Sequence, residues 1–274
     1  MAKKKSLFIW IFAFIFTMAL AYYQRTTGPT YPVRGTISIE SKLIQYKLER
    51  SADCGKDHEV RIKVPDTAVH GMFTFKRYKS NDEWSNVSML RQGEDLVSLM
   101  PAQPAAGKIT YKITLFKNNN FYPLNDDHEV VLRFKQSVPL TLLLFHIFVI
   151  FSAMLLSTVT GLKAIFNGKH LRIYIWLTVI FFFAGGLILG PMVQKYAFNV
   201  YWTGWPFGHD MTDNKTFIGL VFWVVALVIQ YRKPGNRLWP VIASIVFLAV
   251  FLIPHSVFGS EIDYTKPVQT GVHN

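Results

Sequence analysis

Five long apolar runs constrain the fold of this 274-residue chain more than any other feature. A helix needs about 17–25 consecutive apolar residues to cross the hydrocarbon core of a bilayer, so runs of this length predict membrane-spanning helices. The fourth run is the shortest. It crosses the core only if Thr216 and Tyr231 lie among the lipid headgroups, where tyrosine is common. The five runs are Ser6–Tyr23, Val138–Leu162, Ile173–Val193, Phe217–Tyr231 and Leu238–Pro254.

Lysine and arginine predict the direction of these helices, because short cytoplasmic segments carry an excess of both. The N-terminus and the loops after the second and fourth runs are basic and contain no Asp or Glu. The short leader and compact loops are typical of a bacterial protein. We therefore expect the protein to lie in the bacterial inner membrane, with its N-terminus in the cytoplasm and its C-terminus in the periplasm. The basic cytoplasmic segments account for part of the +12 net charge, so we expect no nucleic-acid partner. The basic residues are Lys3, Lys4, Lys5, Lys163, Lys169, Arg172, Arg232, Lys233 and Arg237.

The first run allows two interpretations. A positive start, an apolar stretch and the sequence Ala19-Leu20-Ala21 resemble a secretory signal peptide that is removed after export. The same features fit a membrane anchor that is retained. Residues 1–23 are therefore predicted to be an anchor or a cleaved signal, and the rest of the topology is the same in both cases.

Residues 24–137 follow a different pattern, in which short runs alternate between apolar and polar positions and turn residues separate them. Alternation with period two is typical of strands with one buried face. In "KITYKITLF" the expected buried face consists of Ile109, Tyr111, Ile113 and Leu115. We predict an all-β sandwich similar to an immunoglobulin or fibronectin module, inserted after the first span. A four-helix transmembrane domain at 138–258 and a periplasmic tail at 259–274 complete the predicted organisation.

Three histidines, His146, His209 and His255, are placed by this topology at or near one membrane face. His146 lies inside the second run, where an ionisable residue is costly and usually faces the bundle interior. One interpretation is a neutral histidine that is hydrogen-bonded to another helix. The other is a proton-handling group or a ligand of haem b, copper or zinc. Residues that could support such a site are Asp210, Met211, Glu261 and Asp263.

The connection "VYWTGWPFGHDMTDNKT" is rich in Trp, Gly and Pro, which suit a turn at the membrane interface. We expect it to fold back onto the bundle and to carry His209 over the mouth where His146 and His255 lie. Thr212 or Asp213 is predicted to cap the helix that follows. In the third run, Gly186 and Gly190 are spaced for close helix packing.

Several features are absent from the sequence. None of the five runs contains Asp, Glu, Lys or Arg, which argues against a pump or an ion-coupled carrier. Phosphate-binding loops and the common hydrolase and zinc-protease motifs are missing, so we assign no catalytic residue. A single cysteine, Cys54, excludes an intrachain disulfide.

The segments "AGKITYKITLF" and "GPMVQKYAFNVYWTGWPFGHDMTDNKT" resemble a family of bacterial multi-span membrane proteins of unassigned function. The resemblance covers the outer domain and the last four spans. It implies the same architecture and no particular activity.

Three functional hypotheses follow. The first is a non-enzymatic envelope protein, whose β-domain binds a protein partner and whose spans lie in the lipid bilayer. The second is a redox or metal-binding protein that uses the outer-face histidines. The third is a membrane-surface enzyme acting on lipid or glycan, with His209 as general base and Asp210 or Glu261 as its partner.

Overall fold

The computed structural model describes residues 2–254, 259 and 261–266. The chain divides into two compact units. The helical unit comprises Met1–Pro29 and Val138–Ser260, and the β-unit comprises Thr30–Ser137 and Glu261–Asn274. The predicted combination of helices with several β-sheets is confirmed at this level.

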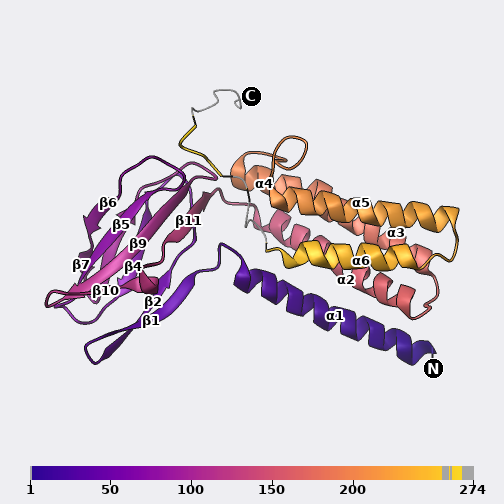
Figure 1. Cartoon of the computed structure of the whole chain (residues 1–274), viewed down its shortest axis with the longest axis horizontal. Helices are drawn as coiled ribbons and strands as arrows, with labels where there is room; N and C mark the ends of the chain where they lie inside the picture. The colour runs from indigo at the N-terminus through magenta and orange to yellow at the C-terminus, as the bar shows by residue number, and fades with distance from the viewer. Residues whose placement is uncertain (1, 255–258, 260, 267–274) are drawn as a thin grey trace. The chain divides into compact units, whose positions relative to one another are not determined.

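Four helices within the described residues are long and apolar enough to cross a membrane, and they match the first four predicted runs. The fifth run forms a helix of only 15 residues. The helices run side by side in Figure 1. They are α1 (Ala2–Thr27), α2 (Leu140–Ile165), α3 (Leu171–Phe182), the π-helix η2 (Phe183–Leu189), α4 (Gly190–Phe198), α5 (Met211–Arg232) and α6 (Leu238–Leu252).

The expectation that no span contains a charged residue is wrong for α5. This helix begins at Met211, six residues before the predicted run, and therefore contains Asp213 and Lys215. Both side chains are buried. The apolar pattern missed this turn because polar contacts inside the protein, rather than lipid, surround it.

Small residues let the helices approach closely. A Cβ atom on Gly186 would lie 2.6 Å from Cγ2 of Thr216 on α5, so only glycine fits there. At Gly190 the nearest atoms would lie at 3.4 Å or beyond, which is ordinary contact distance. Next to these glycines, the rings of Phe182 and Phe247 pack edge to face in the core of the helical unit, with their centres 4.5 Å apart.

The β-unit contains three sheets. The largest has the order β3-β11-β9-β5-β6, with β10 also paired to β9; the second has the order β4-β8-β7, and β1 pairs with β2. The strands are β1 (Val33–Ile39), β2 (Lys42–Leu48), β3 (Ser51–Asp53), β4 (His58–Lys63), β5 (His70–Arg77), β6 (Ser85–Ser88), β7 (Leu90–Gln92), β8 (Asp95–Met100), β9 (Lys108–Lys117), β10 (Asn120–Pro123) and β11 (Val130–Lys135), with a short 3-10 helix η1 (Leu124–Asp127).

One hydrophobic core receives side chains from all three sheets, such as Leu48, Ile62 and Phe73. The four residues of β9 that were expected to face inward are all buried in it. Alternation along a strand therefore predicted the correct face of the longest strand.

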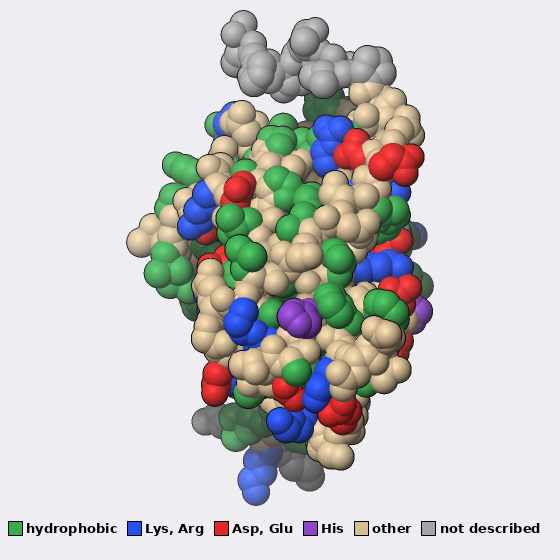
Figure 2. Space-filling view, turned by 90° about the vertical axis from the view of Figure 1, so that its left-hand side faces the viewer, with side chains coloured by type: hydrophobic (Ala, Val, Ile, Leu, Met, Phe, Trp, Pro, Cys, Tyr) green, Lys and Arg blue, Asp and Glu red, His purple; other side chains and the backbone are tan. Residues whose placement is uncertain are grey.

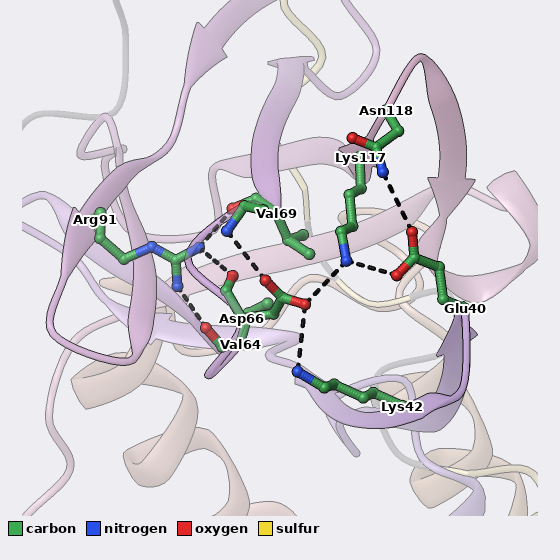
Figure 3. Close-up of polar contacts among 9 residues, drawn as sticks. Glu40, Lys42, Val64, Asp66, Val69, Arg91, Lys117 and Asn118 are labelled. Atoms are coloured by element: carbon green, nitrogen blue, oxygen red, sulfur yellow. Dashed lines mark hydrogen bonds and ion pairs between the residues drawn. The ribbon is translucent and has the colours of Figure 1, made fainter.

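A polar network closes the loop between β4 and β5 (Figure 3). The Arg91 guanidinium donates hydrogen bonds to the backbone carbonyls of Val64, Asp66 and Val69. The Asp66 carboxylate accepts hydrogen bonds from Lys117 at 3.1 Å and from Lys42 at 3.5 Å. The hydrogen bond from Lys117 is the main reason why the pKa of Asp66 lies below its usual value.

The segment that follows α6 returns to the β-unit. The Tyr264 amide donates to the Lys79 carbonyl at 2.9 Å, and its hydroxyl donates to Oε1 of Gln103 at 2.8 Å. The Arg77 guanidinium lies 4.6 Å from the centre of the Tyr264 ring. Residues 261–266 are thus part of the β-unit rather than a separate tail.

Candidate functional site: a buried polar cluster at the start of α5

Asp213 is the centre of a buried polar cluster in the helical unit. Its Oδ2 atom accepts hydrogen bonds from the backbone amides of Thr203 at 2.7 Å and Gly204 at 3.0 Å. The same oxygen lies 3.3 Å from both the Gln194 amide nitrogen and the Thr203 hydroxyl. Asp213 is 6% exposed, and a buried carboxylate needs several donors of this kind. The carboxylate therefore fastens the α4–α5 loop to α5.

Asp210 is the N-cap of α5. Its Oδ1 accepts a hydrogen bond from the Thr212 amide at 2.7 Å, and its Oδ2 lies 3.3 Å from the Thr203 hydroxyl. The predicted cap at Thr212 or Asp213 is therefore wrong, because both residues lie within the first turn. The cap forms earlier since Asp210 is the residue whose side chain reaches the free amides of that turn.

Lys215 joins α5 to the end of α6. Its Nζ donates a hydrogen bond to the Ile253 carbonyl at 2.7 Å and lies 5.8 Å from the centre of the Phe251 ring. Ile253 is the C-cap of α6, where backbone carbonyls have no partner within the helix. Lys215 is 2% exposed, so its ammonium group depends on partners inside the protein.

The loop between α4 and α5 is tied down by further bonds within itself and to the first turn of α5. Whether it carries His209 over the mouth near His146 and His255 stays a prediction, because His255 lies outside the described residues. Nε1 of Trp202 donates to the Trp205 carbonyl at 3.0 Å, and the Trp205 amide donates to Oδ1 of Asn214 at 2.7 Å. The Trp205–Pro206 peptide bond is cis. Trp205 and Phe207 remain strongly exposed, as suits aromatic rings at a membrane interface.

His146 lies on α2 and contacts the π-helix. Its Nδ1 is 3.1 Å from the carbonyl oxygen of Gly185. A carbonyl can only accept, so Nδ1 carries the proton; when the ring is neutral, the lone pair is then on Nε2. The Gly190 amide also donates to the Gly185 carbonyl, in the i to i−5 pattern of a π-helix.

The structure does not place the other candidate residues around His146. His209 is exposed in the α4–α5 loop, and His255 lies outside the described residues. Glu261 belongs to the β-unit, where it forms ion pairs with Lys79 and Lys108. Asp263 also belongs there and accepts hydrogen bonds from the amide and hydroxyl of Thr265.

Met211 is the first residue of α5 and is partly buried. Over residues 2–254, 259 and 261–266, no three His, Cys, Asp or Glu side chains are grouped as a metal site requires. The idea that the histidines converge therefore remains a prediction, because one of them is not described.

Sequence reasoning missed Gln194, Thr203 and Lys215. The signal for Lys215 was present, since it follows the capping segment "DMTDN" by one residue and must lie on the first turns of the helix. Gln194 and Thr203 carried no signal, because their role depends on the fold of the loop. The cluster as a whole holds a loop and two helix ends in place at one end of the bundle.

In comparisons with family models, curated proteins and solved structures, no significant match to the chain was found.

Proposed function

We propose that the chain is a polytopic protein of the bacterial inner membrane whose periplasmic β-unit, an immunoglobulin-like sandwich, binds a protein partner. The helical unit would hold this β-unit at the membrane without catalysing a reaction. The buried residues Asp213 and Lys215 and the partly buried His146 support this view, because each bonds to the backbone of a neighbouring segment.

The chain path supports a specific topology. Val138 leaves the β-unit and Glu261 re-enters it, so an even number of crossings must separate them. The helices α2, α3–α4 and α5 supply three, and we infer that α6 supplies the fourth. At 1.5 Å per residue, its 15 residues cover about 22 Å, which a locally thinned bilayer accommodates. The basic loops then lie in the cytoplasm.

A strip of apolar side chains on the three-stranded sheet of the β-unit is the surface that we propose binds the protein partner. Leu90 on β7 is the ladder neighbour of Val97 on β8, and Leu99 follows on the same face of β8. Leu90 and Leu99 are 69% and 58% exposed, whereas Val97 between them is buried. Their position is opposite to the core, which receives Leu96 and Met100 from the other face of β8.

Charged side chains border this strip. Arg61 is the ladder neighbour of Val97, and Glu59 is the neighbour of Leu99. Figure 2 shows hydrophobic side chains on the surface of the β-unit among Lys, Arg, Asp and Glu. Apolar residues with a charged rim are typical of protein interfaces.

The experiment compares charge substitutions on and off the strip. The full-length protein is purified from its native membrane in mild detergent, and the mass of the complex is measured. We expect Leu90→Asp and Leu99→Asp to lose a bound protein that the unchanged chain retains. Val87→Asp, at an exposed position on β6 in the other sheet, is the matched control and should retain it. Loss in all three variants, or in none, would contradict the proposal.

His146 favours a second candidate, a haem or metal protein. Metal-binding histidines usually donate their other ring N–H to a carbonyl or carboxylate, and His146 makes such a bond to Gly185. Its Nε2 would be the ligand, with His209 or His255 as possible partners. A visible spectrum and elemental analysis for iron, copper and zinc test this. Stoichiometric metal that disappears in His146→Ala supports the candidate, and a metal-free protein contradicts it.

A further inference from the structure

Three side chains form a polar contact between the ends of α3 and α5. Nε1 of Trp176 donates a hydrogen bond to the Tyr231 hydroxyl at 2.9 Å, and the two rings meet edge to face. The Arg172 guanidinium lies 4.9 Å from the centre of the Tyr231 ring. All three side chains are exposed.

These residues lie at the end of the helical unit where α2 connects to α3 and α5 connects to α6 (Figure 1). The connecting segments are basic and contain no Asp or Glu. Among the described residues, no carboxylate lies within ion-pair distance of Arg172. The exposed cations of the two connecting segments and their helix ends are Lys169, Arg172, Arg232 and Lys233, and Lys4 and Lys5 of α1 are exposed at the same end.

Two other cations nearby are already used to hold the bundle together. Arg237 donates hydrogen bonds to the backbone carbonyls of Lys163 and Gly168, at 3.3 and 3.5 Å. Lys163 is 7% exposed and lies over the Tyr174 ring. Arg172 differs from both because it is exposed and, within the described residues, its guanidinium lies over an aromatic ring rather than against a backbone carbonyl.

An apolar surface continues from this contact along both helices. On α3 it includes Ile173, Leu177 and Ile180, which share one helical face with Trp176. On α5 it includes Val224 and Val228, which share a face with Tyr231. In a membrane, such exposed residues contact acyl chains. A cation therefore lies directly at the head of a lipid-facing surface.

We propose that Arg172, Trp176 and Tyr231 form a binding site for the headgroup of an anionic phospholipid. The guanidinium presents paired N–H donors that match the oxygens of a phosphate. The Tyr231 hydroxyl oxygen accepts a hydrogen bond from Trp176, so the hydroxyl proton of Tyr231 remains available to donate to another acceptor, such as a phosphate oxygen. Lys169 and Arg232 add positive charge that favours a net-negative headgroup over a zwitterionic one.

The apolar surface beside Arg172 favours a lipid over a free phosphate as the ligand, because only a lipid has acyl chains that would contact it. The exposed apolar residues that follow Arg172 on α3 and precede Tyr231 on α5 are covered when acyl chains lie against them, which removes apolar surface from competing detergent. A basic pocket between helix ends on the positively charged side of a membrane protein is a common place for such headgroups.

Native mass spectrometry of the delipidated full-length protein in nonionic detergent tests the site. The probes are phosphatidylglycerol, phosphatidylcholine and inorganic phosphate. We expect phosphatidylglycerol to bind about tenfold more tightly than phosphatidylcholine, and Arg172→Gln to remove most of this preference. Tyr231→Phe deletes only a hydroxyl, so it tests the site even if the arginine variant is unstable; we expect about threefold weaker binding.

Lys195 offers a matched control. Its Nζ lies 5.3 Å from the centre of the Tyr201 ring, and Lys195 lies at the opposite end of the bundle from Arg172. Lys195→Gln should leave phosphatidylglycerol binding unchanged. The proposal is wrong if Lys195→Gln and Arg172→Gln weaken binding equally, if Arg172→Gln and Tyr231→Phe bind as the unchanged protein does, or if inorganic phosphate displaces the lipid at equal concentration.

Discussion

Nδ1 of His146 lies 3.1 Å from the carbonyl oxygen of Gly185, and this contact joins α2 to the π-helical segment that precedes α4. The bond explains how an ionisable side chain is accommodated in a helix that is long and apolar enough to cross a membrane. Gly185 favours the close approach of the two helices, because a Cβ atom there would lie 3.2 Å from the Ile150 amide nitrogen on α2, which is a tight contact. The close approach of the two helices and the hydrogen bond therefore depend on each other.

Replacing His146 with leucine should destabilise the bundle modestly. The substitution leaves one acceptor position of Gly185 empty, and hydrogen bonds between membrane helices contribute about 0.5–2 kcal/mol. His146→Gln can still donate an N–H and should recover part of the loss. Thermal unfolding in detergent measures both variants. Equal stability of all three proteins would show that the contact has no energetic role.

Asp213→Ala should release the α4–α5 loop. The substitution leaves the Thr203 and Gly204 amides without their acceptor, and each buried donor that loses its partner costs about 1–3 kcal/mol. We expect a lower unfolding temperature and faster proteolysis within residues 200–210.

A carboxylate of the β-unit serves as the control for that variant. Asp127 is 60% exposed and forms a single ion pair with Lys112 at 3.1 Å. Asp127→Ala should change neither the unfolding temperature nor the cleavage of the loop, since exposed ion pairs contribute little. Unchanged loop cleavage in Asp213→Ala would contradict the role given to Asp213.

The long-range part of the structure could not be predicted from the sequence. Apolar run length located the helices, and alternation located the buried face of β9, because both patterns are local. The cap of α5 was predicted two or three residues too late, at Thr212 or Asp213, because Asp210 and Asp213 are bonded to Thr203, which lies outside the helix. Glu261 was expected to support a site near the histidines, and its ion pairs with Lys79 and Lys108 were not predicted, because they depend on the fold of the β-unit.

Gly35→Ala should weaken the β1–β2 hairpin. A Cβ atom at this position would lie 2.3 Å from the Tyr46 hydroxyl, so the ring must move. That hydroxyl accepts a hydrogen bond from the Asn125 amide at 3.0 Å, and the movement breaks it. We expect a loss of about 1–2 kcal/mol in unfolding free energy. Tyr46→Phe, which removes only this bond, should account for most of the loss; a neutral Gly35→Ala would contradict the argument.

The ion pair between Arg77 and Asp82 should make the β-unit sensitive to acid. Two hydrogen bonds, at 2.7 and 2.8 Å, join the guanidinium to the carboxylate. They lower the pKa of Asp82 to about 2. Because the folded pKa is depressed, the stabilisation is complete above the unfolded value near 4 and is lost as the pH falls towards 2.

Asp82→Asn isolates this effect. The variant should be less stable than the unchanged protein at pH 6, and the difference between the two should shrink as the pH falls from about 4 to about 2. Unfolding of the full-length protein in detergent, followed across this range, measures the difference. A difference that stays constant with pH would show that Asp82 contributes through packing rather than through its charge.

The inferred crossing of α6 gives the last prediction. Single cysteines are introduced into a Cys54→Ser background, and intact spheroplasts are treated with a maleimide that does not cross membranes. Ser85→Cys in the β-unit and Thr265→Cys after α6 are both exposed and should react together. Lys233→Cys, in the loop before α6, should react only after the membrane is permeabilised. If Thr265→Cys, like Lys233→Cys, reacts with the maleimide only after the membrane is permeabilised, then α6 does not cross the bilayer. That result would contradict the inferred topology, in which residues 261–266 lie on the same side as the β-unit.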